Sequence, residues 1–211
     1  MNSIQWIVIA GFLALGLALP VAADESVVVR VLQKSGEPLQ NALVLLDVTE
    51  ASEAEPSTYV MDQVDMAFNP HVLVVPKGAP VAFPNSDPVG HHVYSFSRPN
   101  QFVLPLYRGT SPDPITFDHP GVVVLGCNIH DNMIGYIVVT ENQVHGWTDE
   151  EGRIELGPRS AELAQNVHVW SPRLSTRKEQ LSYAVTDGVV EIQLQHKLKR
   201  ATSQSAKFAQ Y

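Results

Sequence analysis

The segment GVVVLGCNIHDNMIGYIVV, residues 121–139, contains the only cysteine of the chain, Cys127. His130 lies three positions after the cysteine, and Met133 lies three positions after the histidine. One apolar run precedes these side chains and another follows them, which predicts two β-strands. Cys127, His130 and Met133 are therefore expected on the loop that joins the two strands.

This loop has the side chains of a metal site. It offers a thiolate, an imidazole and a thioether. Sulfur ligands select soft metals, and imidazole also binds copper, so the set favours copper over zinc or calcium. The loop lacks one strong ligand, and we expect a second imidazole from another part of the chain.

The second imidazole is expected in the segment FPNSDPVGHHVYSF, residues 83–96. The pattern predicts a strand that ends near Pro84, then a polar turn, then a strand that opens with two histidines. Successive side chains of a strand point to opposite faces. Only one of His91 and His92 can therefore face the metal.

The two segments together resemble the cupredoxins, the family of type 1 (blue) copper proteins, and especially its plastocyanin-like and amicyanin-like members. The pattern Asn-x5-His in the first segment, followed later by Cys-x2-His-x2-Met, is similar to the family pattern. Residues 68–83 resemble the two strands that precede the first ligand. The resemblance covers roughly residues 59–140 and implies a Greek-key β-sandwich. More narrowly, the chain resembles exported cupredoxin-like proteins labelled methylamine utilisation proteins.

The resemblance implies one type 1 copper ion with two nitrogen ligands, one thiolate and one weak axial thioether. The implied ligands are His91, Cys127, His130 and Met133. The spacing selects His91 over His92, which stands where the family usually has another polar residue. Asn85 falls where the family has an asparagine that joins the two ligand loops by hydrogen bonds, and such bonds hold ligand geometry.

The function implied by the resemblance is electron transfer by Cu(I)/Cu(II) cycling, without enzymatic activity. His130 is the implied exit for the electron, and a c-type cytochrome or a periplasmic dehydrogenase is the expected partner. The family's partners dock on an apolar patch around this histidine, but Asp131 and Asn132 adjoin it here. The alternative function is copper delivery or sequestration without redox turnover.

Simpler interpretations exist for each residue taken alone. A free cysteine is often a small buried hydrophobe, a lone methionine is more often core than ligand, and a lone histidine is more often on the surface. A purely structural β protein would leave Cys127 unexplained. No nucleophile elbow, phosphate-binding loop or HExxH motif indicates catalysis. The conjunction of the four side chains therefore favours the metal site.

Residues 1–23 have the pattern of a secretory signal. The stretch from Trp6 to Leu19 is almost wholly apolar, Pro20 interrupts it, and the small residues ending at Ala23 provide a cleavage site. The apolar run is short for a membrane span, which needs about 20 residues. We expect export to the periplasm and cleavage after Ala23; a retained anchor is the alternative.

The charge and the cysteine content agree with an exported protein. The formal net charge is −8, and it stays −8 without residues 1–23, which contain no charged side chain. A protein of net negative charge is a poor partner for nucleic acid. A single cysteine cannot form an internal disulfide. In an oxidising compartment an unpaired thiol therefore indicates a function or a protected site.

The remaining chain predicts further β-strands. Short β-branched runs alternate with turns rich in glycine and proline, and no segment shows a sustained helical period. Within the flanks, residues 24–58 and 141–196, the stretches 36–44, 148–156 and 167–170 resemble parts of carboxypeptidase-regulatory-like, transthyretin-type sandwiches. We expect these flanks to fold together as a second small sandwich, with the copper domain, residues 59–140, inserted between them. The alternative is that both flanks extend the first sandwich. Residues 197–211 are expected to form a frayed, basic tail.

Overall fold

The computed structural model describes residues 25–48, 57–98, 100–109, 112–159, 166–174, 180–184 and 189–200. Within these ranges all regular secondary structure is β-strand, numbered β1 to β17. The all-β prediction is therefore confirmed. None of these residues belongs to a helix long and apolar enough to cross a membrane. The expected signal sequence, residues 1–23, lies outside the described part of the chain.

The first β-sandwich contains the candidate metal ligands. Its larger sheet has five strands in the order β6 (Val72–Pro76), β12 (Ile134–Thr140), β11 (Gly121–Gly126), β8 (His91–Ser95) and β9 (Phe102–Tyr107). The other sheet has the order β10 (Ile115–Phe117), β7 (Ala79–Ala82) and β3 (Tyr59–Val60). A hairpin of β4 (Asp62–Val64) and β5 (Ala67–Asn69) lies beside them. One buried cluster joins these layers and includes Cys127 and Met133.

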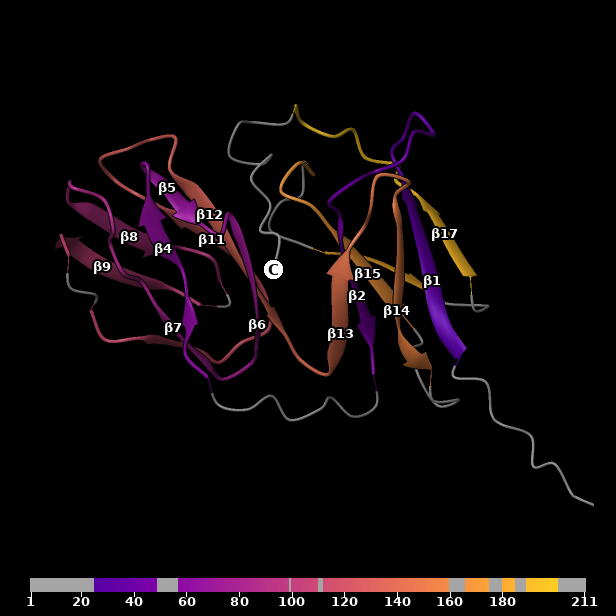
Figure 1. Cartoon of the computed structure of the whole chain (residues 1–211), viewed down its shortest axis with the longest axis horizontal. Coiled ribbons are helices and arrows are strands. Elements are labelled where there is room, and N and C mark those ends of the chain that lie inside the picture. Colours follow the sequence, from indigo (N-terminus) through magenta and orange to yellow (C-terminus); the bar gives the residue numbers. More distant parts are fainter. Residues whose placement is uncertain are drawn as a thin grey trace, which may run out of the picture.

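The second β-sandwich combines strands from both flanks. One sheet has the order β14 (Arg153–Arg159), β1 (Glu25–Leu32) and β17 (Val189–Gln193). The other has the order β13 (Gln143–Trp147), β2 (Leu43–Asp47), β15 (Asn166–Trp170) and β16 (Leu181–Ala184). β1 pairs parallel with β17 and antiparallel with β14. The flanks therefore share one hydrophobic core, and Figure 1 shows it as a separate lobe beside the first sandwich. The exact domain boundaries stay predictions.

The two sandwiches pack against each other through a third apolar cluster. β2 contributes Leu43 and Leu45, β15 contributes Trp170, and β12 contributes Tyr136 and Val138. The alternate residues of β2 and β12 face the cores of their own sandwiches. Strands buried on both faces read as nearly continuous apolar runs, which explains why the segment GYIVV shows no polar alternation.

The last described residues are more ordered than expected for a frayed tail. Leu198 packs against the core of the second sandwich. The Lys199 backbone N–H donates to the Arg173 carbonyl at 2.8 Å. Residues 201–211 lie outside the described part of the chain.

The interface between the sandwiches predicts a large stability loss in Trp170→Ala. Trp170 is fully buried, and its ring lies 5.1 Å from that of Tyr136. Truncating a buried tryptophan costs about 3 to 5 kcal/mol, which urea denaturation would measure. Val144 is exposed on β13, at the edge of the same sheet, and Val144→Ala should change the unfolding free energy by less than about 0.5 kcal/mol. Equal effects of the two variants would contradict the packing described here.

His71 should make the protein less stable in mild acid. Burial lowers the pKa of His71 to about 4, and a hydrogen bond with the Ile134 backbone opposes this only in part. The usual pKa is about 6.5, so the unfolded chain takes up this proton first. Stability should therefore fall as the pH drops from about 6.5 to 4, by up to about 3 kcal/mol. Urea denaturation across this range should show a shallower decline in His71→Phe, and parallel curves would refute the assignment.

Candidate metal centre

The structure brings together the side chains of His91, Cys127 and His130. The two imidazole Nδ1 atoms lie 3.2 Å apart, and Cys127 Sγ lies 3.8 Å from each of them. Among the described residues, no other group of three histidine, cysteine or acidic side chains brings its ligand atoms within 4.8 Å of one another. His91 and Cys127 are buried and His130 is partly buried, so the site lies just beneath the surface.

The spacing of the three atoms fits a metal ion. The point equidistant from them lies about 2.1 Å from each atom, and imidazole and thiolate bonds to a metal such as zinc are about 2.0 to 2.3 Å long. Two nitrogens and one thiolate are also the trigonal set of blue-copper sites. The residues present therefore fit copper.

The β11–β12 hairpin positions two of these side chains. Gly126 ends β11 and pairs with Ile134, which begins β12, so residues 127–133 form the connecting loop. The Met133 backbone N–H donates to the His130 carbonyl at 2.9 Å. This bond closes the turn that carries His130.

The glycine immediately before the cysteine makes room for the tip of a tyrosine side chain. The ring of Tyr94 on β8 lies over Gly126, and a Cβ added there would lie 2.8 Å from ring atoms of Tyr94. Gly126 and Tyr94 are also paired across β11 and β8. The absence of a side chain at Gly126 thus leaves space for the Tyr94 ring across the two strands that carry Cys127 and His91.

Strand alternation separates the two adjacent histidines. The even positions of β8 are partly exposed and the odd positions are buried, so His91 lies inside and His92 outside. His91 Nδ1 belongs to the three-atom cluster. The ring of His92 instead lies 6.0 Å from the ring of Tyr94. The structure therefore brings His91, and not His92, to the other candidate ligands.

Met133 lies next to the cysteine in the core. It is buried and belongs to the same apolar cluster as Cys127. Both residues border a hollow of about 330 Å³. Met133 is thus placed on the sulfur side of the site, and its role as the axial ligand stays a prediction.

Asn85 organises the loop that precedes His91. Its Nδ2 donates to the carbonyls of Val89 at 2.9 Å and Tyr107 at 3.1 Å, and its Oδ1 accepts from the Asp87 backbone N–H at 3.0 Å. None of these bonds reaches the cysteine loop. These three bonds lie within the segments that precede and flank His91, and the role of Asn85 in joining both loops stays a prediction.

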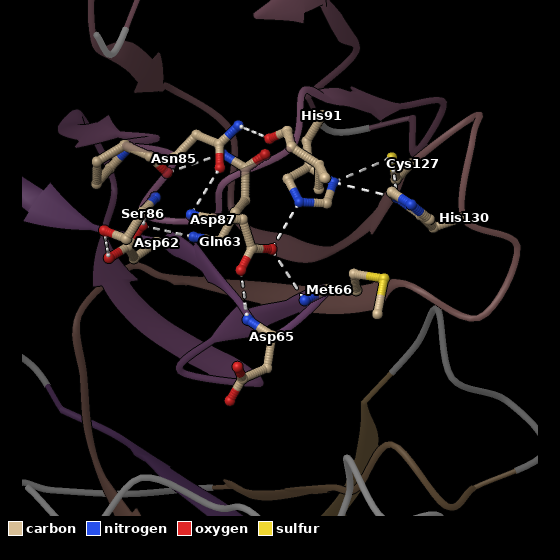
Figure 2. A network of polar contacts seen from close by, with 12 residues as sticks. Asp62, Gln63, Asp65, Met66, Asn85, Ser86, Asp87, His91, Cys127 and His130 are labelled. Carbon is tan, nitrogen blue, oxygen red and sulfur yellow. Dashed lines mark hydrogen bonds and ion pairs between the residues drawn. The ribbon is translucent and has the colours of Figure 1, made fainter. Parts of the chain in front are cut away.

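Asp87 connects His91 to the β4–β5 turn. Its Oδ2 lies 2.7 Å from His91 Nε2 and accepts from the Met66 backbone N–H at 2.9 Å. Its Oδ1 accepts from the Asp65 backbone N–H at 2.7 Å. Figure 2 shows the carboxylate between this turn and the imidazole, whose opposite edge faces Cys127 and His130.

The Asp87 carboxyl is ionised at neutral pH. Partial burial raises its pKa, but the hydrogen bonds from the turn and from His91 outweigh this effect and leave the pKa below its ordinary value. The His91 ring therefore has an anion on one edge and the candidate metal position on the other.

Sequence reasoning missed Asp87. The only signal was an aspartate four positions before the histidine, within a segment interpreted as a polar turn. Its importance depends on two donors from the β4–β5 turn, more than 20 positions away. Spacing along the chain does not reveal such contacts.

Comparisons with known proteins cover only part of the chain. No family model and no curated protein matches the sequence. A copper-containing nitrite reductase from Thermus scotoductus SA-01 is 28% identical, with a TM-score of 0.39, over 53% of this chain and 28% of its own. A reduced Cu(I) form of an amicyanin variant at pH 4 is 23% identical, with a TM-score of 0.36, over 47% of this chain and 99% of its own. A purple cupredoxin from Nitrosopumilus maritimus is 21% identical, with a TM-score of 0.35, over 39% of this chain and 99% of its own.

This chain spans little more than a quarter of the nitrite reductase. All three TM-scores are below 0.5. The function proposed below therefore rests on the donor atoms of this chain.

The two adjacent histidines provide a matched test of the site. His91→Ala removes a donor atom of the cluster, and His92→Ala removes a neighbouring imidazole that lies on the other face of β8. We expect His91→Ala to weaken copper binding at least 100-fold and His92→Ala to leave it within threefold, as measured by competition with a chelator of known affinity. A larger loss in His92→Ala would refute the assignment.

Proposed function

We propose that this chain is a type 1 copper protein that carries electrons between redox partners by Cu(I)/Cu(II) cycling. The observation that carries the proposal is the buried group of one sulfur and two imidazole nitrogens, separated by 3.2 and 3.8 Å. These atoms already have the spacing that a bound metal requires.

The surroundings of the ligands suit a carrier of electrons. Bound copper would supply the one-electron redox change, tuned by its ligands and their apolar surroundings. Cys127 is fixed within the core of the first sandwich, and Asp87 holds the far edge of His91. Close packing on these sides resists movement of the donor atoms, so little reorganisation should accompany each transfer.

We propose His130 as the exit for the electron, because it is the most exposed of the three donors. The apolar surface near it comes from several loops. Ile129 adjoins His130, Met66 and Val89 adjoin the residues that hold His91, and Leu106 lies beside Gly90; all four are exposed. This surface offers an apolar contact for a partner even though Asp131 and Asn132 follow the histidine.

The location and the partner are further parts of the proposal. A signal sequence at residues 1–23 would place the site in the periplasm. A c-type cytochrome or a periplasmic dehydrogenase would then exchange electrons with it. The resemblance to proteins labelled methylamine utilisation proteins does not identify the partner. We propose a carrier and assign no catalytic residue.

The first test compares residues 24–211 with the Cys127→Ser variant after addition of Cu(II). The wild type should show an intense visible charge-transfer band, because a thiolate bound to Cu(II) absorbs strongly, and the variant should lose it. Reversible voltammetry would then establish redox cycling. A pale spectrum that is unchanged by the substitution would overturn the proposal.

The same sample separates the carrier from a copper delivery protein. A carrier should hold copper in both oxidation states and retain it when mixed with a chelator of moderate affinity. A delivery protein should bind Cu(I) strongly, bind Cu(II) weakly and release the metal to an acceptor. That second result would replace electron transfer by delivery while preserving the ligand assignment.

A further inference from the structure

The Asp87 carboxylate has three hydrogen-bond partners, two in the β4–β5 turn and one on His91. The Asp65 and Met66 backbone N–H groups and His91 Nε2 lie 2.7, 2.9 and 2.7 Å from its oxygens. Its side chain is only 7% exposed. A carboxylate held by three donors has a well-defined position, and hydrogen bonds to an ionised group are the strong ones.

The β4–β5 turn is shaped to hold this carboxylate. Asp65 and Met66 have φ values of 54° and 55°, the left-handed conformation that is uncommon for residues with a side chain. In this conformation successive backbone N–H groups converge on one anion. The Asp87 backbone is fixed independently, because its N–H donates to Asn85 Oδ1. Two segments distant in sequence thus position one carboxylate against one imidazole.

The orientation of His91 determines the position of its proton. Nδ1 faces the sulfur and the second imidazole, so it must carry a lone pair to bind a metal. Nε2 faces the carboxylate and must then carry the hydrogen, which it donates to Asp87. A carboxylate in this place selects the tautomer that a ligand needs and increases the basicity of the ligand.

We propose that Asp87 is the positioning residue of the metal site: it orients His91, selects its Nε2–H tautomer and lowers the reduction potential. The inference rests on the copper function proposed above and extends it to the β4–β5 turn, which becomes a third segment of the site. The physical reason is electrostatic. A fixed negative charge close to the site favours the ion of higher positive charge, so Asp87 stabilises Cu(II) more than Cu(I).

The test is the reduction potential of the copper-loaded Asp87→Asn variant. The amide retains the shape of the side chain but loses the charge and cannot accept all three bonds. We expect the equilibrium constant for reduction to rise about tenfold, which is about 59 mV for a one-electron couple. Asp87→Glu restores the charge and should return the potential most of the way to the wild-type value.

Asp131→Asn is the matched control. Asp131 adjoins His130, is exposed, and has no hydrogen bond to any described ligand. The substitution removes the same unit of charge near the site, but solvent and salt screen it. We expect less than a threefold change in the equilibrium constant. Equal changes in the two variants, or no change in Asp87→Asn, would overturn the proposal.

A second measurement determines the tautomer of His91 in the metal-free wild-type protein, so it requires neither bound copper nor a substituted variant. Nitrogen NMR of the metal-free wild type at pH 8, with 15N-labelled histidine, should show a hydrogen on Nε2 of His91 and none on Nδ1. A hydrogen on Nδ1 would overturn the proposal. If the copper-loaded protein lacked the thiolate band but His91 still showed the Nε2–H tautomer, the electron-transfer function would fail while the role of Asp87 in orienting His91 would stand.

Discussion

The burial of the β11–β12 hairpin on both faces is the constraint on which the rest of the molecule depends. One face of the hairpin packs into the core of the first sandwich, and the other packs against the second sandwich. A hairpin held in this way cannot slip by one residue, because a slip would exchange its two apolar faces and move its loop. The loop that carries Cys127 and His130 therefore has a fixed position relative to β8. The second sandwich thus contributes to the position of the metal site by packing against this hairpin.

The site itself lies between two different environments. On the sulfur side, Cys127 and Met133 belong to the apolar core, where close packing limits movement. On the imidazole side, a polar series runs from Asn85 to Asp87 to His91. Each member of the series holds the next through a hydrogen bond. Apolar packing therefore fixes the thiolate, and hydrogen bonds fix the first imidazole. A single short sequence motif cannot describe the site, because its thiolate is positioned by apolar packing and its first imidazole by hydrogen bonds.

Much of the fold and three of the donor atoms could be predicted from sequence. Continuous apolar runs and dense turns indicated strands, and the spacing of Cys127 and His130 on one loop indicated a metal site, because both signals depend on nearby positions. The alternation of side chains along a strand, which also depends only on nearby positions, placed His91 and His92 on opposite faces. The contacts of Asn85 and Asp87 could not be predicted, since they depend on how the loops fold back on each other. The left-handed turn at Asp65 and Met66 was equally hidden, because neither residue is a glycine that would have indicated it.

Two aspartates near the site are engaged in hydrogen bonds within the first sandwich. Asp62 is engaged by Ser86, and Asp87 is engaged by the β4–β5 turn and His91. The Asp87 carboxylate therefore serves the internal structure of the site, whereas the bonds between Asp62 and Ser86 lie at the surface. The Met66 side chain is left exposed on the outer side of the same turn. The Met66 backbone N–H holds the Asp87 oxygen that faces His91, so the same turn exposes an apolar side chain and contacts the residue that holds the ligand. Under the proposals made above, partner contact and redox tuning would involve the same turn.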